Sequence, residues 1–234
     1  MTDVRLHRRR LMSAAVAGTA ALAGAGAATA QPAAPAATPS FAPKPLPFDP
    51  GSIAGFSDKL LISHHDNNYA GAVKRLGPIQ AAIAALDPAT APGFALNGLK
   101  REELIAWNSM ILHELYFANL GAPSQPGGKV AAALEQAFGG VDRWAAQFSA
   151  MGKALGGGSG WVVLNYSHRD GRLVNQWAAD HTMALATSSP ILVLDMYEHA
   201  YAIDYGAKAG AYVDAFMKAI KWDAADERFA RSAG

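Results

Sequence analysis

Two stretches in the first half of the chain repeat apolar residues every three or four positions, which is the period of one helix face. The first stretch spans residues 56–86 and carries on this face Leu60, Leu61, His64, Asn68, Ala72, Val73 and Leu76. The second spans residues 99–120, with Glu102 and Glu103 in its expected first turn, where the helix dipole favours acids. Its stripe consists of Ala106, Ser109, Met110, His113, Tyr116, Phe117 and Leu120. The pattern predicts an N-terminal helical hairpin domain over residues 51–121.

The second half changes from helical to strand periodicity at the glycine-rich stretch 156–160. Helices are expected before it, over 129–138 and 141–155, and strands after it, over 161–166, 172–177 and 190–194. Asp170-Gly171 fits the turn between the first two strands. Further helices are expected from about 197 and over 208–220. The fold class is therefore α+β: the hairpin is followed by a C-terminal domain over 129–234, a small three-stranded antiparallel sheet with flanking helices.

The first 30 residues have the pattern of an export signal peptide. Arg5, Arg8, Arg9 and Arg10 precede an uncharged Ala/Gly-rich run, and Ala28-Thr29-Ala30 fits the small-residue cleavage pattern. The adjacent arginines resemble a twin-arginine signal, which indicates a periplasmic or otherwise exported protein. The alternative is a membrane anchor, but a run of Ala and Gly is weakly hydrophobic. Residues 31–50 are rich in Pro and Ala and are expected to form an extended, poorly ordered linker.

Charge and cysteine content narrow the range of functions. Residues 1–30 hold four of the 20 Lys and Arg and one of the 19 Asp and Glu, so the remainder has a net charge of −2. With no basic stripe, nothing indicates a nucleic-acid partner, and no membrane contact is expected after signal cleavage. The chain has no cysteine, which excludes disulfides, thiol chemistry and Cys-ligated zinc or iron–sulfur sites.

Several histidines lie in the helical stripes. His113 is in the middle of its apolar stripe, and His64 lies on the inner face of the preceding helix. A lone histidine in such a position is commonly a hydrogen-bonded core residue and can also be a metal ligand. His65 is about 100° further around the helix and should point elsewhere. His168 falls in the predicted hairpin turn and is expected to be solvated.

Asp195 and His199 follow the apolar run Ile191–Leu194, which suits a buried strand. An aspartate at the end of such a strand is costly to desolvate unless a group pairs with it, and a histidine four residues later can turn back toward it. A buried Asp–His hydrogen bond without metal would satisfy the pattern. A metal would satisfy it together with the helical histidines, because three imidazoles and one carboxylate suit iron, manganese or zinc.

The segment LDMYEHAY, which contains these two residues, resembles the strand-end D-x-W-E-H-A-Y pattern of iron/manganese superoxide dismutases. FSDKLLISHHDNNYAGAVKRL is similar to the first helix of that family, SMILHELYF to its second and LGGGSGWVVLNY to its G-S-G-W segment, so the resemblance covers nearly the whole chain after residue 51. It implies one Fe or Mn ion per chain and superoxide as substrate. The implied metal ligands are His64, His113, Asp195 and His199.

Two more residues acquire roles from this resemblance. His181 falls where many members have a glutamine that hydrogen-bonds the metal-bound solvent; the residues alone allow a surface histidine before the loop 182–189. Glu198 corresponds to a family glutamate that bonds a ligand histidine of the other subunit, which implies a homodimer with Glu198 at the interface. A solvated acid at a helix N-terminus is the alternative for Glu198.

The substrate gateway departs from the family pattern. The family usually has a second His four residues after the first ligand and a Tyr four residues later, whereas this chain has Asn68 and Ala72. Tyr69 lies in the neighbouring register and is a candidate substitute. The catalytic candidates are accordingly His181, Asn68 and Tyr69.

Other departures lie further along the chain. The family's Tyr after E-H-A-Y, which reaches across the dimer interface, is Ala202 here, and its Trp between Asp and Glu is Tyr197. The family's Arg-Pro near the substrate funnel is replaced by Ala209-Gly210, with Lys208 adjacent as a source of positive potential.

The sequence therefore favours a superoxide dismutase that converts superoxide to oxygen and hydrogen peroxide at a mononuclear Fe or Mn centre. The replaced gateway keeps two alternatives open: a metal-binding protein of this fold with little dismutase activity, and a related oxidoreductase whose wider funnel admits a larger substrate. The ligand set serves both metals and does not choose between iron and manganese.

Overall fold

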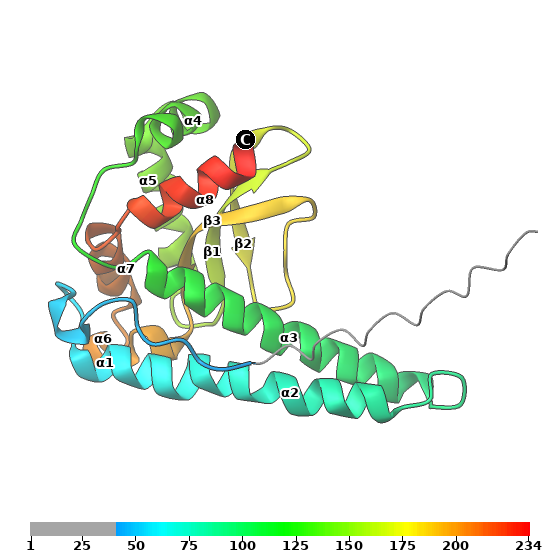
Figure 1. Ribbon diagram of the computed structural model, residues 1–234. Coiled ribbons are helices and arrows are strands. Elements are labelled where there is room, and N and C mark those ends of the chain that lie inside the picture. The colour runs from blue at the N-terminus through cyan, green and yellow to red at the C-terminus, as the bar shows by residue number, and fades with distance from the viewer. Residues whose placement is uncertain (1–40) are drawn as a thin grey trace, which may run out of the picture. The chain divides into compact units, whose positions relative to one another are not determined.

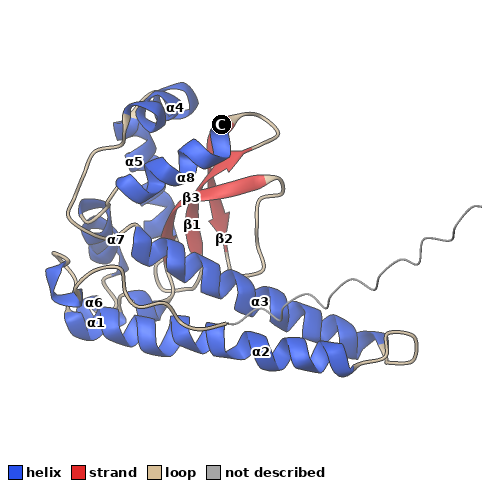
Figure 2. Cartoon of the chain, in the orientation of Figure 1, coloured by secondary structure: helices blue, strands red, loops and turns tan. Residues whose placement is uncertain are grey.

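The computed structural model describes residues 41–234, so the predicted signal peptide and residues 31–40 of the predicted linker lie outside the described residues. The helices are α1 Asp58–Ser63, α2 Ala70–Ala85, α3 Gly93–Ala118, α4 Gly128–Phe138, α5 Val141–Ala154, α6 Ala202–Tyr205, α7 Ala209–Lys218 and α8 Asp223–Ala233. The strands are β1 Trp161–Ser167, β2 Arg172–Ala178 and β3 Ser188–Asp195. The predicted α+β class is confirmed: a helical hairpin precedes a three-stranded sheet with helices around it (Figures 1 and 2). No helix within residues 41–234 is long and apolar enough to cross a membrane.

The first arm of the hairpin is one continuous helical rod with a wider turn in it. Ser57 caps α1, because its hydroxyl accepts a hydrogen bond from the backbone N–H of Leu60 at 3.0 Å. A π-helical turn, His64–Tyr69, joins α1 to α2. Such turns are rare and often occur at functional sites, and this one begins at His64.

The second arm is longer than the sequence pattern indicated. Helix α3 begins at Gly93, directly after Pro92, and not near residue 99. The expected first-turn position of Glu102 and Glu103 is therefore wrong, since both lie well inside the helix. Pro92 and Gly93 suit this position, because the first N–H groups of a helix need no helical partner. Helices α2 and α3 pack side by side over their length (Figure 1).

The sheet has the order β2-β1-β3, with both pairs antiparallel. Trp161 at the start of β1 pairs with Ala178 on one side and with Asp195 on the other. Pro190 occupies edge strand β3 beside a register shift, a position where its missing N–H removes little from the ladder. The central strand therefore begins next to the aspartate that ends β3.

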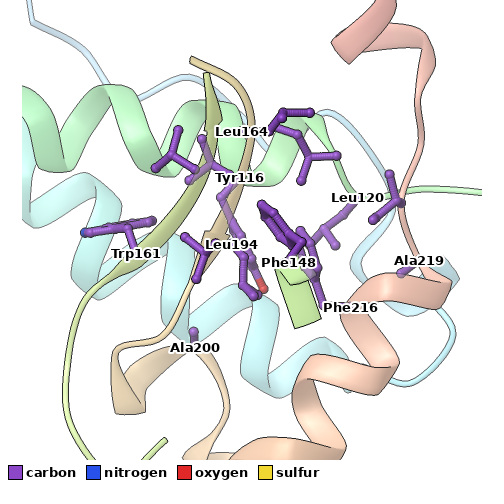
Figure 3. Packing of buried hydrophobic residues seen from close by; sticks show 14 of the residues in the cluster. Tyr116, Leu120, Phe148, Trp161, Leu164, Leu194, Ala200, Phe216 and Ala219 are labelled. Atoms are coloured by element: carbon purple, nitrogen blue, oxygen red, sulfur yellow. The ribbon is translucent and has the colours of Figure 1, made fainter. Parts of the chain in front are cut away.

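One hydrophobic core joins the hairpin to the sheet. Side chains from α3, α5, α7, β1 and β3 and from the residues just after α3 meet in it (Figure 3), among them Tyr116, Leu120, Phe148, Phe216, Trp161, Leu164 and Leu194. Helix α8, which the sequence pattern did not predict, packs against β3 and buries Phe229 and Ala225. The hairpin and the sheet are thus held in fixed relation, and the ends of α1 and β3 meet between them.

The segment 41–49 is non-helical but makes specific contacts with the hairpin. The ring of Phe41 meets Trp107 edge-on at 5.6 Å, and the backbone N–H of Lys44 donates to the hydroxyl of Tyr69 at 2.9 Å. Phe41, Leu46 and Phe48 pack against the core. The expectation of a poorly ordered linker is therefore wrong for this part of 31–50, because its aromatic and apolar side chains have a surface to bury against.

Candidate metal centre

The first predicted ligand, His64, is completely buried at the start of the π-helical turn. Its Nε2 lies 3.1 Å from Oδ2 of Asp195, while its Nδ1 has no hydrogen-bond partner among the described residues. The ring packs between Tyr116 and Phe117 of α3, with centroids 5.1 and 5.0 Å away. Burial lowers the pKa of His64, so its ring is neutral at neutral pH. His65 points elsewhere as expected, with its Nε2 against the backbone carbonyl of Lys44 at 2.7 Å.

The second, His113, has its tautomer fixed by its own helix. Its Nδ1 lies 2.6 Å from the backbone carbonyl oxygen of Ser109, one turn earlier, and only an N–H can bond a carbonyl there. Nε2 consequently carries a lone pair, and it points at His199 and Asp195. Burial lowers the pKa of His113 to about 3, so the ring stays neutral and available as a ligand.

Asp195 ends β3 and is fully buried. Its Oδ1 accepts the backbone N–H of Tyr197 at 2.9 Å, which turns Oδ2 toward the histidines. Burial alone would raise the pKa of Asp195, but the imidazoles around it, His199 foremost, hold it below its ordinary value. The carboxylate is therefore charged, and its backbone carbonyl accepts the hydroxyl of buried Tyr212 at 2.7 Å.

His199 lies in the short 3-10 turn Glu198–Ala200 that follows β3. Its Nε2 is 3.2 Å from Oδ2 of Asp195 and 3.3 Å from Nε2 of His113. The segment after it is tied to the start of α1, because Asp204 accepts both the backbone N–H and the hydroxyl of Ser57, at 2.7 and 2.6 Å. This contact holds the His199 segment against the helix that carries His64.

The structure thus brings together the four residues that the sequence indicated. One donor atom from each of His64, His113, Asp195 and His199 lies within 4.8 Å of the others. Donor atoms about 2.0–2.2 Å from one ion are expected roughly 3–4 Å apart, and the close pairs here are separated by 3.1–3.5 Å. A cation would compensate these groups, because lone pairs and a carboxylate face one another across the cluster. Neutral imidazoles and one carboxylate suit iron or manganese.

A pocket of 340 Å³ leads to this cluster. Its lining includes two of the ligand candidates, His113 and His199, and the replaced gateway positions Asn68 and Ala72. The remaining lining residues are Asn67, Gly71, Arg75, Ser109, His181 and Tyr197. A small molecule entering here would reach the imidazole rings directly.

Comparison with known proteins agrees with this arrangement. Residues 126–228 match the family model of iron/manganese superoxide dismutases, C-terminal domain. A superoxide dismutase [Fe] from Cupriavidus metallidurans is 64% identical over 187 residues, which are 80% of this chain and 95% of that protein. A superoxide dismutase [Fe] from Aquifex pyrophilus is 33% identical over 78% of this chain and 88% of its own length. A superoxide dismutase [Mn] from Halobacterium salinarum is 32% identical over 81% and 94%.

The chain belongs to the iron/manganese superoxide dismutase family. Members with iron and members with manganese in their names are both among its relatives. The predicted family resemblance and the predicted Fe or Mn cofactor are therefore supported by sequence relatives as well as by the buried cluster.

His181 has the surroundings of a positioned donor. The indole N–H of Trp161 donates to its Nδ1 at 3.0 Å, so the proton of the neutral ring is on Nε2. The ring stacks on Tyr197 at 4.8 Å, and the side-chain amide of Asn108 donates to the backbone carbonyl of His181 at 2.6 Å. Burial lowers the pKa of His181. This half-buried histidine therefore offers an N–H donor to the pocket that it lines.

The structure separates the two gateway candidates. Asn68 lines the pocket, but Tyr69 is not among the lining residues. The Tyr69 hydroxyl donates to Glu114 at 3.0 Å and accepts from the backbone of Lys44, on the side of the helix that faces the segment 41–49. Tyr69 is buried there, so of the two candidates Asn68 is the one that lines the pocket. Consecutive residues lie about 100° apart around a helix, which places these two on different sides of the rod.

The sequence pattern did not indicate several residues that support the site. Ser109 lies four residues before His113, so its carbonyl could have been anticipated from helical spacing. Tyr212 and Asn108 gave no local signal, since they reach Asp195 and His181 from 17 and 73 residues away. Lys208, proposed as a source of positive potential, is exposed and is not among the lining residues of the pocket.

Proposed function

We propose that this chain is an exported, iron-dependent superoxide dismutase that acts as a homodimer. The observation that carries the activity is the buried His64–His113–Asp195–His199 cluster at the end of a pocket, in a chain 64% identical to a protein named superoxide dismutase [Fe]. The same relative favours iron over manganese. His64, His113 and His199 would hold the ion through ring nitrogens, and Asp195 through a carboxylate oxygen.

The bound ion supplies one-electron redox chemistry: one superoxide is oxidised to oxygen, and a second is reduced, with two protons, to hydrogen peroxide. The chain's own residues provide position and proton handling. His113 and His64 stay neutral because they are buried, and charged Asp195 offsets part of the ion's charge. His181 holds a proton on Nε2 because Trp161 occupies its other nitrogen. It can therefore hydrogen-bond oxygen atoms in the pocket without needing a positive charge.

Metal-loaded protein decides between this function and its alternatives. Residues 31–234 would be reconstituted separately with iron and with manganese, the bound metal quantified, and superoxide dismutation measured in each sample. Fast turnover with iron supports the proposal, and equal turnover with manganese would remove the preference for iron. Full occupancy by metal with negligible turnover would contradict the proposed dismutase activity.

One observation favours the second candidate, a metal-binding protein of this fold with little dismutase activity. Asn68 and Ala72 line the pocket where the family has the gateway His and Tyr, so both gateway groups are changed together. The small residues Gly71 and Ala72 also leave space in the pocket, which fits the third candidate, an oxidoreductase with a larger substrate. Negligible dismutation by fully loaded protein would favour these two, and turnover of an organic peroxide would then select the third.

Dimer formation and export are separate parts of the proposal. Glu198 is exposed next to His199, which leaves its carboxylate free to reach a second copy of the chain. Sedimentation of wild type and of Glu198→Gln tests dimer formation, and a monomeric wild type would rule out the homodimer. Export rests on Arg9 and Arg10 ahead of the Ala/Gly-rich run, and replacing both by Lys should leave the protein in the cytoplasm.

A further inference from the structure

A second pocket, of 290 Å³, lies apart from the metal centre. It forms between the segment 41–49, the π-helical turn, the second half of α3 and the end of α8, and it shares no lining residue with the pocket that leads to the ligand cluster. Two arginines of α8, Arg228 and Arg231, line it, and we call it the arginine pocket. They are three residues apart, so both lie on the same side of the helix.

Arg228 lines the pocket without an acidic partner among residues 41–234. Its Nε donates to the backbone carbonyl of Ile191 at 2.8 Å, which holds the guanidinium against β3. Its Nη2 is buried and has no hydrogen-bond partner in the same range of residues. Burial and the neighbouring charge of Arg231 lower the pKa of Arg228 to about 10, so the group stays charged at neutral pH. The pocket therefore contains a half-buried positive charge with which no carboxylate pairs, and such a charge is costly.

The other two permanently charged cations of the pocket each have an acidic partner. Nζ of Lys44 lies 2.5 Å from a carboxylate oxygen of Glu114, the acid that lines the pocket, so these two charges offset each other. Arg231 is 3.9 Å from a carboxylate oxygen of Glu227, and both side chains are mostly exposed. Because an exposed pair of this kind contributes little, Arg231 is free to turn toward an anion beside Arg228.

Much of the remaining lining is apolar. Pro45 and Pro47 of the segment 41–49 contribute to it, together with Leu115, Phe117 and Ala118 of α3. Packing an apolar body against these side chains removes surface from water on both partners, which is favourable. Ligand pockets commonly combine such a lining with a few placed polar or charged groups. The arginine pocket thus suits a molecule that has one anionic group and an apolar remainder.

We propose that the arginine pocket binds a small organic carboxylate. The carboxylate pairs with Arg228, because a guanidinium favours planar carboxylates as partners, and Arg231 adds a second positive charge. The apolar body of the ligand lies against Leu115 and Pro47. This binding site goes beyond the proposed dismutase function and does not depend on it, since none of the four ligand candidates lines the pocket.

The test measures binding of benzoate to the iron-loaded full chain by isothermal titration calorimetry. Benzoate joins a carboxylate to an apolar ring, benzamide keeps the shape without the charge, and inorganic phosphate keeps a charge without an apolar body. Arg228→Met removes the charge but keeps a long side chain, and Ala118→Leu narrows the pocket without changing a charge. Arg75→Gln is the matched control, because it removes an arginine that lines the metal pocket instead.

Arg228→Met should weaken benzoate binding about tenfold or more, because a charged hydrogen bond in a half-buried site is lost. Ala118→Leu should weaken it as well, since the added side chain takes up space in the pocket, and Arg75→Gln should leave it unchanged. Wild type should bind benzamide and phosphate about tenfold more weakly than benzoate, because each lacks one of the two features that the pocket recognises.

Three results would overturn the inference. The first is a wild type that binds benzoate no better than benzamide or phosphate, or not at all. The second is a loss in Arg75→Gln as large as that in Arg228→Met, because benzoate would then occupy the metal pocket. The third is an unchanged affinity in Ala118→Leu, which also decides the question if Arg228→Met does not fold. If the iron-loaded protein binds benzoate but does not dismutate superoxide, only the proposed function fails.

Discussion

Tyr212 supports the metal centre through a hydrogen bond to the backbone of Asp195. Its hydroxyl can be removed while the ring is kept. It is completely buried in α7, 17 residues after Asp195. The hydroxyl has one proton to donate, and the backbone carbonyl of Asp195, 2.7 Å away, can only accept it. The 3.3 Å contact with the hydroxyl of Tyr116 therefore has Tyr116 as donor. Tyr212→Phe would leave both of its partners, the carbonyl of Asp195 and the hydroxyl of Tyr116, buried without this hydrogen bond.

The magnitude follows from these two bonds. A buried acceptor that loses its donor costs about 1–3 kcal/mol, and the longer contact with Tyr116 adds the smaller share. We expect Tyr212→Phe to lower the free energy of unfolding by about 2–3 kcal/mol. For a folded unit of this size, about 2–4 °C is lost per kcal/mol, so the melting temperature should fall by roughly 4–12 °C. Metal stoichiometry should be retained, because the carboxylate of Asp195 is unchanged.

Urea unfolding of the metal-free protein measures this cost without the contribution of metal binding. Tyr205→Phe is the matched control, since Tyr205 also donates to a backbone carbonyl, that of Gly55, but is only half-buried, so water can replace it. It should lose less than about 1 kcal/mol. A loss for Tyr212→Phe below about 0.5 kcal/mol, or no greater than that for Tyr205→Phe, would refute the reasoning that the buried hydroxyl supports Asp195.

Three further predictions address the ligands and their supports. His113→Ala should abolish stoichiometric metal binding in elemental analysis, and retention of full metal would rule out its assignment as a ligand. His181→Ala should keep the metal but change turnover or its pH profile, so an unchanged rate and profile would remove its role in the pocket. Gly160→Ala should lower the urea unfolding free energy by more than about 3 kcal/mol, because Gly160 has φ +137° and an added Cβ would lie 2.2 Å from the carbonyl oxygen of Ala178. Gly157→Ala, with φ +81° and open space around it, is its control; equal losses would contradict the steric argument.

The elements and the ligand candidates could be predicted because their signals are local. Helical spacing placed His64 and His113 on inward faces, and the apolar run before Asp195 marked the end of a buried strand. The register of the sheet then fixes the position of Asp195, since β3 ends opposite the start of β1 at Trp161. Residues whose position depends only on their own helix or strand could therefore be predicted from the sequence.

The surroundings of the site could not be predicted, because they depend on contacts between distant segments. The contacts of Tyr69 with Lys44 and Glu114, which are 25 and 45 residues away along the chain, are an example. Lys208 looked suitable from its place in the sequence, but the loop before α7 leaves it exposed elsewhere.

The four ligand candidates differ in how firmly the protein holds them without metal. His113 is bonded to Ser109, Asp195 to Tyr197 and Tyr212, and the segment after His199 to Ser57. His64 is held by packing against aromatic rings and by the contact of its Nε2 with Oδ2 of Asp195, and its Nδ1 has no partner among residues 41–234. When an ion takes the lone pair of Nε2, the proton of the neutral ring is on Nδ1, and a buried donor left unsatisfied costs about 1–3 kcal/mol. His64 therefore has no second hydrogen bond that would orient its ring when an ion is bound.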